Sequence, residues 1–402
     1  MRVLFVTRCY WPVVGGVESF VRELSHELAR EHDVTVFARR IDPGPAARLT
    51  DSLTPPPVFE PFEDDGVDVQ CFRIPRKRRV MMAPLGLEVL PLFRRYAYGR
   101  TRWLYASLYA HAAAPVIAEA ARDADVIHMW GGGHIAAAAV RAADLTGVPL
   151  VITPFAHEGQ WGDDVGSASA YRKADAVIGL LETDAKLYRQ LGVSDDRLRV
   201  CGVCSPGVTP GTGETVRSQV GVRGPVVLFL GVRREYKGFD LLVEAAPLVH
   251  ARHPDVTFAF AGPGRAISSA EAGGARVIDL GEVDDAGRAA WLDAADVLCL
   301  PSQGETFGMV ILEAWSVETP VVVSDIPSLS ELVRLSGGGV TVRRAPSAIA
   351  ATISELLDEP ARLREHGARG RYYWASHHTP AIVAAWHEHL YGRLAEAGRQ
   401  RQ

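Results

Sequence analysis

The chain has 402 residues, of which 48% are hydrophobic and 23% charged, and its formal net charge at pH 7 is −5. This length predicts two or three folded domains, and the negative charge argues against a protein that coats nucleic acid, which needs a basic excess. The five cysteines are scattered and imply no disulfide framework. The sequence contains no run of 18 uncharged apolar residues and its first residues do not fit a secretory signal, so we expect a cytoplasmic protein without a membrane-spanning helix.

The first half of the chain alternates short apolar runs with helical patterns. An apolar run at 3–6 precedes a glycine-rich loop at 12–16, an amphipathic helical pattern over 17–28 and a second apolar run at 34–37. This order is the βαβ unit of a parallel α/β sheet. Further strands are expected at 125–128, 149–153 and 176–178, and further helices over 135–145 and 185–191.

A second series of strands and helices follows a stretch rich in Gly, Pro, Ser and Thr at 202–224, which we interpret as an interdomain linker. We therefore predict two doubly wound Rossmann-like domains, residues 1–207 and 208–375, that face each other across a cleft. Ligands of such sheets bind beyond the carboxyl ends of the strands, so the cleft is the expected site. The strands expected in the second domain lie at 226–230, 257–261, 276–278, 297–300 and 320–323, and the helices at 239–250 and 309–317.

The stretch 73–102 combines nine basic residues with interleaved apolar ones, and Glu88 is the one acidic residue in it. Two interpretations stay open. The stretch is either a solvated basic loop with a partly buried helix, or a patch for an anionic acceptor or an anionic membrane surface.

The segment 300–314 places two carboxylates around the start of a helix. A strand ends at Leu300, a short loop carries Glu305, and a helix begins near Gly308, whose N-terminus suits a phosphate. Glu313 lies five residues further on, about 7.5 Å along the helix, which is close to the span from a diphosphate to a ribose. Carboxylates accept hydrogen bonds from sugar hydroxyls. Spacing alone also allows Glu305 as a helix cap and Glu313 as a solvated helix residue.

A cationic loop follows the strand that ends at Leu230. Residues 231–238 contain Arg233 and Lys237, at the edge of the sheet where ligands bind. Both side chains are candidates for neutralising a diphosphate leaving group. The alternative is a pair of isolated surface cations.

Taken together, these segments resemble the family-four retaining glycosyltransferases of the GT-B fold, nearly from end to end. The two-glutamate segment with seven residues between Glu305 and Glu313 is the most specific match. The other matching segments are 12–18, 32–36, 153–157, 231–238 and 320–331. The resemblance also implies a C-terminal helix at 376–402 that crosses back to the first domain, and closure of the domains over the donor.

The resemblance implies a donor site made mostly by the second domain, and an acceptor site made mostly by the first. Gly16 would lie beside the donor diphosphate, and Arg233 and Lys237 would bind it. Glu305 would accept hydrogen bonds from the sugar, Glu313 from the ribose, and His157 would line the reacting sugar. The backbone that would hold phosphate and sugar belongs to Phe307, Gly308, Met309 and Val310.

One position departs from the family pattern. The family usually has an Arg directly after the glycine at position 231, and this chain has Val232 there. We assign the role to Arg233, so the expected catalytic set is Glu305, His157, Lys237 and Arg233. No Asp-x-Asp pair lies in a suitable loop, so we expect a leaving group stabilised by cations and helix amides, with no metal and no other cofactor.

We therefore predict a retaining transferase of carbohydrate biosynthesis that moves a hexose from a nucleotide-diphosphate sugar to an acceptor hydroxyl. On the second interpretation of the stretch 73–102, the acceptor would be anionic or lipid-linked, and the protein would contact the inner face of the membrane through that stretch. A related phosphorylase or sugar-nucleotide epimerase, or a non-catalytic sugar-nucleotide-binding protein, remains the alternative. A nicotinamide dehydrogenase is disfavoured because the loop after the strand 257–261 lacks the third glycine of the dinucleotide fingerprint.

Overall fold

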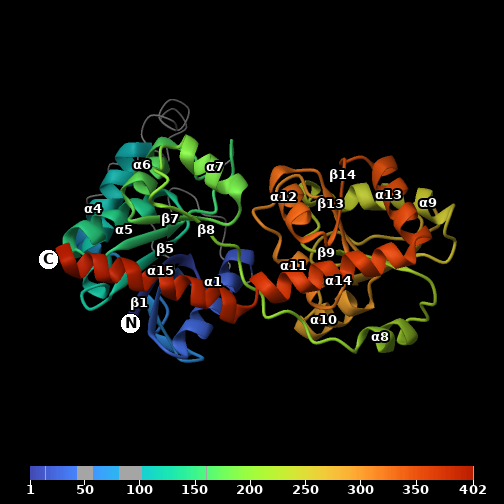
Figure 1. Ribbon diagram of the computed structural model, residues 1–402, viewed down its shortest axis with the longest axis horizontal. Coiled ribbons are helices and arrows are strands. Elements are labelled where there is room, and N and C mark those ends of the chain that lie inside the picture. Colours follow the sequence, from blue (N-terminus) through green and yellow to red (C-terminus); the bar gives the residue numbers. More distant parts are fainter. Residues whose placement is uncertain (14, 43–57, 81–101, 160, 402) are drawn as a thin grey trace. The chain divides into compact units, whose positions relative to one another are not determined.

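The computed structural model describes residues 1–13, 15–42, 58–80, 102–159 and 161–401 (Figure 1). The chain divides into two compact units. The first unit contains Met1–Gly202 and Val383–Gln402, and the second contains Val203–Ile382. Each is an α/β fold around a mainly parallel sheet, as the alternation of apolar runs and helical patterns predicted.

In the first unit the described residues form a sheet in the order β3-β4-β2-β1-β5-β6-β7-β8. All neighbouring strands are parallel except β3, which runs antiparallel to β4 at one edge. The strands are β1 (Arg2–Cys9), β2 (Asp33–Arg40), β3 (Phe62–Asp64), β4 (Val67–Cys71), β5 (Val126–Trp130), β6 (Leu150–Thr153), β7 (Ala176–Gly179) and β8 (Leu198–Val200). The helices are α1 (Gly16–Ala29), α2 (Arg76–Arg79), α4 (Arg102–Ala120), α5 (Gly133–Thr146), α6 (Val165–Lys173), α7 (Glu182–Gln190) and α15 (Pro380–Arg401).

The apolar pattern explains these elements. The interior residues of β1 are buried on both faces of the sheet, as is typical of a parallel strand covered by helices. Helix α1 buries Phe20, Val21, Leu24 and Leu28, which recur at helical spacing on one side. The first βαβ unit therefore forms where the sequence predicted it.

The second unit contains an all-parallel sheet in the order β11-β10-β9-β12-β13-β14. Its strands are β9 (Val226–Leu230), β10 (Thr257–Ala261), β11 (Arg276–Gly281), β12 (Val297–Leu300), β13 (Val321–Ser324) and β14 (Gly339–Val342). Its helices are α8 (Gly213–Gln219), the 3₁₀ turn η3 (Glu235–Lys237), α9 (Phe239–His250), α10 (Asp285–Ala294), α11 (Met309–Ser316), α12 (Pro327–Ser336), α13 (Pro346–Asp358) and α14 (Pro360–His377).

The stretch 202–224, expected to be a linker, is mostly part of the second unit. It contains α8, and Asp293 of α10 accepts hydrogen bonds from the amides of Gly211 and Gly213 at 2.8 and 2.7 Å. A composition rich in Gly, Pro, Ser and Thr indicates turns, and here the turns are packed against a neighbouring helix.

The C-terminal helix packs on the first unit, as the family resemblance implied. One helix was expected from residue 376, but α14 ends at His377 and α15 begins at Pro380, because proline cannot continue a helix and disfavours helical backbone before it. On α15 the Tyr391 hydroxyl lies 2.5 Å from His128 Nδ1 of β5. The buried side chains around this contact include Trp130 and His387.

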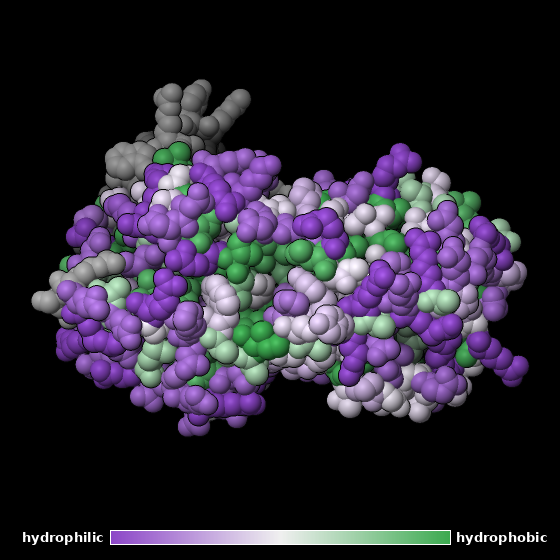
Figure 2. Space-filling model, in the orientation of Figure 1, coloured by the Kyte–Doolittle hydropathy of each residue, from purple (hydrophilic) through white to green (hydrophobic). Residues whose placement is uncertain are grey.

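Polar and charged side chains cover most of the visible face of both units (Figure 2). Within the described residues, no helix is long and apolar enough to cross a membrane. Of the basic stretch 73–102, residues 81–101 lie outside the described residues. In the described part, Arg73, Arg76 and Lys77 are exposed.

Candidate active site

Two loops of the second unit leave the same edge of the sheet. They follow the neighbouring parallel strands β9 and β12, so both lie at carboxyl ends, where ligands of such sheets bind. The backbone N–H of Gln303 donates a hydrogen bond of 2.6 Å to the backbone carbonyl of Tyr236. Gly238 approaches the other loop so closely that a Cβ there would lie 2.2 Å from the Pro301 carbonyl oxygen. The two loops therefore form one packed unit.

This packing brings together Lys237 and Glu305, two of the residues predicted from the sequence. Lys237 Nζ lies 2.6 Å from Glu305 Oε1, and the Ser302 hydroxyl donates to the same oxygen at 2.9 Å. Both side chains of the ion pair are largely buried, at 22% and 14% exposure. Glu305 is thus held by a cation and a hydroxyl and does not cap helix α11, whose N-cap is Gly308. This excludes the helix-cap alternative.

Gly308 gives the start of α11 its geometry. Its φ of 85° lies in the left-handed region, and a Cβ would lie 2.9 Å from Ile311 Cδ1. Phe307 is buried beside it, 5.3 Å from the His378 ring, while Met309 and Val310 open the helix with partly exposed side chains. First-turn amides have no partner within a helix and carry its positive end, so this turn offers hydrogen-bond donors to an anion.

Glu313 follows in the next turn of α11 and is buried, so it is not the solvated helix residue that spacing alone allowed. Its Oε1 accepts a hydrogen bond of 2.7 Å from Arg288 Nη1 on α10. Arg288 could not be identified from the sequence, because nothing in its local pattern distinguishes it from a solvated helix cation.

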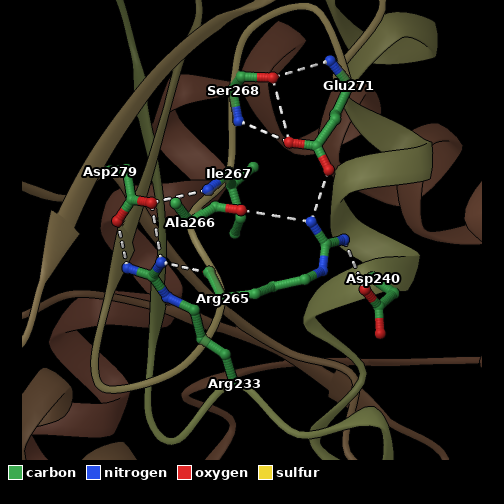
Figure 3. A network of polar contacts seen from close by, with 8 residues as sticks. All are labelled: Arg233, Asp240, Arg265, Ala266, Ile267, Ser268, Glu271 and Asp279. Carbon is green, nitrogen blue, oxygen red and sulfur yellow. Dashed lines mark hydrogen bonds and ion pairs between the residues drawn. The ribbon is translucent and has the colours of Figure 1, made fainter.

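The Arg233 guanidinium points toward the Asp279 carboxylate (Figure 3). Its side chain is 1% exposed, and its guanidinium makes two hydrogen bonds to the Asp279 carboxylate, at 2.9 and 2.5 Å. It also donates to the carbonyls of Phe260 and Arg265 at 2.7 and 2.9 Å. Arg233 therefore holds the loop in place from inside the domain, which corrects the predicted diphosphate contact.

The same network extends to the loop between β10 and β11. Arg265 pairs with Asp240 at 2.9 Å and with Glu271 at 2.5 Å, which ties this loop to the first turn of α9. The hydrogen bonds from Arg233 lower the pKa of Asp279 to about 2. The available sequence signal was an acidic residue at 279, directly after the predicted strand 276–278.

Gly16 and His157 belong to the first unit and are described within it. Gly16 opens helix α1 directly after the loop that follows β1. His157 lies after β6, where its backbone pairs with Trp161 and its ring lies 5.0 Å from the indole. Strands β1 and β6 both flank β5 and run parallel, so the two residues leave the same edge of that sheet.

Comparisons with known proteins cover both units. Residues 15–204 match the family model described as glycosyl transferase 4-like domain, and residues 224–359 match glycosyl transferases group 1. The chain is 30% identical to a D-inositol 3-phosphate glycosyltransferase of Acidothermus cellulolyticus, over 90% of this chain and 83% of the relative. A phosphatidyl-myo-inositol mannosyltransferase of Mycobacterium tuberculosis is 33% identical over 45% of this chain and 50% of its own.

Among solved structures, HepE of Anabaena in complex with UDP-glucose superposes with a TM-score of 0.66, covering 99% of each chain at 16% identity. That likeness concerns the fold, whereas the matches in sequence extend over the segments that carry Lys237, Glu305 and Glu313. The chain therefore belongs to the family-four glycosyltransferases of the GT-B fold, and it is a glycosyltransferase.

Proposed function

We propose that this glycosyltransferase moves a hexose from a nucleotide-diphosphate sugar to an acceptor hydroxyl, with retention of configuration and without a metal ion. The observation that carries the proposal is the Lys237–Glu305 ion pair of 2.6 Å in the loops next to the N-terminus of α11. A cation, a sugar-binding carboxylate and free helix amides are the groups that a diphosphate-linked sugar needs.

Each part of the donor is assigned to the protein groups whose charge and hydrogen-bonding capacity suit it. The amides from Phe307 to Val310 and the Lys237 ammonium suit the diphosphate, Glu305 suits the hydroxyls of the sugar, and Glu313 suits the ribose. The UDP-glucose complex of HepE, which shares this fold, supports a nucleotide-sugar donor. The roles that the resemblance implies for Gly16, near the diphosphate, and His157, near the reacting sugar, remain proposals.

The chemistry follows from where charge develops. As the bond from the anomeric carbon to the diphosphate oxygen breaks, the sugar gains oxocarbenium character and the diphosphate gains negative charge. Lys237 and the helix amides stabilise the leaving group in the transition state. The acceptor hydroxyl attacks from the same face, forms the new bond to carbon and gives its proton to the departing phosphate oxygen. No covalent enzyme intermediate is needed.

The acceptor carries an anionic group in this proposal. The names of both relatives contain a phosphorylated inositol, and the described part of the basic stretch exposes Arg73, Arg76 and Lys77. Flotation with anionic liposomes separates a membrane-borne acceptor from a free one. Binding at low salt supports the membrane-borne form and a peripheral position on the inner face of the membrane, whereas no binding removes it.

The first test is calorimetry or thermal shift with UDP, GDP, ADP and TDP in the presence of EDTA, with NAD as the control. A diphosphate that binds supports the donor site and names its base. Turnover of the matching sugar nucleotide should then persist in EDTA and give a product with the anomeric configuration of the donor. If NAD binds and none of the diphosphates does, the proposed donor is wrong.

A further inference from the structure

Helices α10 and α11 are joined by one ion pair that the family resemblance did not suggest. Arg288 Nη1 donates to Glu313 Oε1 at 2.7 Å, between side chains that are 37% and 11% exposed. The carboxylate is thus far more buried than the cation. An ionised carboxylate that is removed from water needs a counter-charge and hydrogen bonds to remain ionised.

The other contacts of Arg288 are weaker. Its Nη2 lies 3.1 Å from Asp285 Oδ1, but the Asp285 side chain is 98% exposed, and such surface pairs contribute little. Its Nε makes no hydrogen bond with the residues that the structure describes. The contact with Glu313 is therefore the interaction that fixes the guanidinium.

A carboxylate has about four acceptor positions, and the hydrogen bond from Arg288 occupies one of those of Glu313. Because Arg288 approaches from α10, it fixes the plane of the Glu313 carboxylate relative to the start of α11, where the proposed diphosphate lies. The orientation of this carboxylate then decides whether it can accept hydrogen bonds from the two hydroxyls of a ribose.

We propose that Arg288 is a positioning residue that holds the Glu313 carboxylate in the orientation that faces the ribose, and that the pair thereby sets a preference for ribonucleotide over dideoxyribonucleotide donors. This inference rests on the proposed function and adds to it the residue that determines sugar recognition in the nucleotide. Arg288 itself does not touch the substrate.

The test compares the affinities of UDP and 2′,3′-dideoxy-UDP, measured by calorimetry, because their ratio isolates the ribose contact. If the nucleotide screen identifies another base, the diphosphate of that base and its dideoxy form replace these two ligands here and in the predictions below. The wild-type protein should prefer UDP by about tenfold or more, the scale expected for hydrogen bonds to a charged group. Arg288→Met should bring the ratio close to one and leave the affinity for dideoxy-UDP nearly unchanged. Arg288→Lys should restore part of the preference, because an ammonium can still donate to Glu313.

Asp285→Asn is the matched control, since it removes the exposed partner of the same guanidinium and should keep the wild-type ratio. Glu313→Gln should lose the ratio as Arg288→Met does. If Arg288→Met lowers the melting temperature too far to be used, Arg288→Lys and Arg288→Gln provide the same comparison, with a partial and a full loss of the ratio expected.

The failures are distinguishable. A wild-type ratio near one overturns the ribose contact of Glu313, and no binding of any nucleoside diphosphate overturns the proposed donor. A ratio that is lost in Glu313→Gln but kept in the Arg288 variants overturns this inference alone.

Discussion

Lys237 and Glu305 stand 68 positions apart in the sequence and meet at 2.6 Å. Replacing Lys237 with Ala removes the cation next to the proposed leaving group. We expect kcat/KM to fall about a hundredfold or more, the scale seen when a group that stabilises transition-state charge is lost, and UDP to bind more weakly. Steady-state kinetics and calorimetry measure both. Lys186→Ala, on an exposed position of α7, is the control that should change neither.

Replacing Glu305 with Ala separates sugar recognition from diphosphate binding. The variant loses the proposed acceptor for sugar hydroxyls but keeps Lys237, which is then released from its ion pair. Turnover should fall about a hundredfold or more, while the affinity for UDP stays at the wild-type level or rises. Unchanged turnover would overturn the role assigned to Glu305.

Asp279 makes the stability of the second unit depend on pH in the acidic range. Its pKa in the folded protein is about 2 because Arg233 donates to it, against an ordinary value of 3.8. Because the pKa of Asp279 is lower in the folded protein than in the unfolded chain, its ionised carboxylate stabilises the fold, and this contribution is complete above the unfolded pKa. The contribution is lost as the pH falls from about 4 to about 2. Asp279→Asn should therefore be less stable than wild type at pH 6, and the difference should shrink in that acidic range. Denaturant unfolding at several pH values measures it, and a difference independent of pH would contradict the assignment.

At the scale of single residues, the sequence brought out candidate side chains but not the partners that hold them. Glu305, Lys237 and Glu313 lie in motifs with informative spacing. The partners Asp279 and Arg288 come from other elements, 46 and 25 positions from the residues they bind. Local patterns contain no information on such contacts. Arg233 was therefore predicted to bind the diphosphate, whereas the structure shows its charge paired with Asp279 inside the domain.

At the scale of elements, the loop-to-helix turn at Gly308 depends on a backbone that other residues adopt only with strain. Gly308→Ala places a Cβ at φ 85° and 2.9 Å from Ile311 Cδ1. We expect a loss of about 1–2 kcal/mol in the free energy of unfolding and weaker UDP binding, because the first amides of α11 shift.

The matched control for this variant is Gly392→Ala in the middle of α15, where a Cβ meets nothing within 4 Å. Alanine favours the helix there and should raise stability by about 0.5–1 kcal/mol. Equal effects of the two substitutions on stability and on UDP binding would argue against a special role for the turn at Gly308.

The strands were predictable because parallel strands covered by helices read as continuous apolar runs. Residues 226–230 and 257–261 coincide with β9 and β10. Helix α8 was not predicted, since its seven residues carry no apolar periodicity and it is held by contacts with Asp293 and Asp296. Short elements stabilised by distant side chains are therefore the ones that pattern reasoning misses.

At the scale of the whole molecule, the return of the C-terminal segment to the first unit came from the family resemblance. The residues that hold it there were not predicted: His128 contacts both the Tyr391 hydroxyl and the Thr153 hydroxyl from the middle of the sheet. His387 packs among the rings of His128, Trp130 and Tyr391. The burial of His128 could not be predicted from its local sequence, because one of its partners lies more than 200 positions away.

This packing makes the first unit sensitive to acid above the range in which Asp279 acts. Burial lowers the pKa of His387 to about 4 from an ordinary 6.5. Burial also lowers the pKa of His128 well below its ordinary value, with the charge of His387 adding to the effect. The neutral histidines therefore make their full contribution to the free energy of unfolding above pH 6.5. This contribution falls as the pH decreases toward 4, because the unfolded chain takes up the protons first.

His387→Phe keeps a ring of similar shape in place and removes one of these two proton sites. The wild-type protein should lose about 3 kcal/mol through His387 between pH 7 and pH 4, and the variant should lose correspondingly less. Trp130, buried in this cluster, provides a fluorescence signal for unfolding of the first unit. His111→Phe, on an exposed position of α4, should retain the wild-type pH dependence. If His387→Phe and the wild type lose stability in parallel on acidification, the packing of α15 is not linked to the protonation of His387.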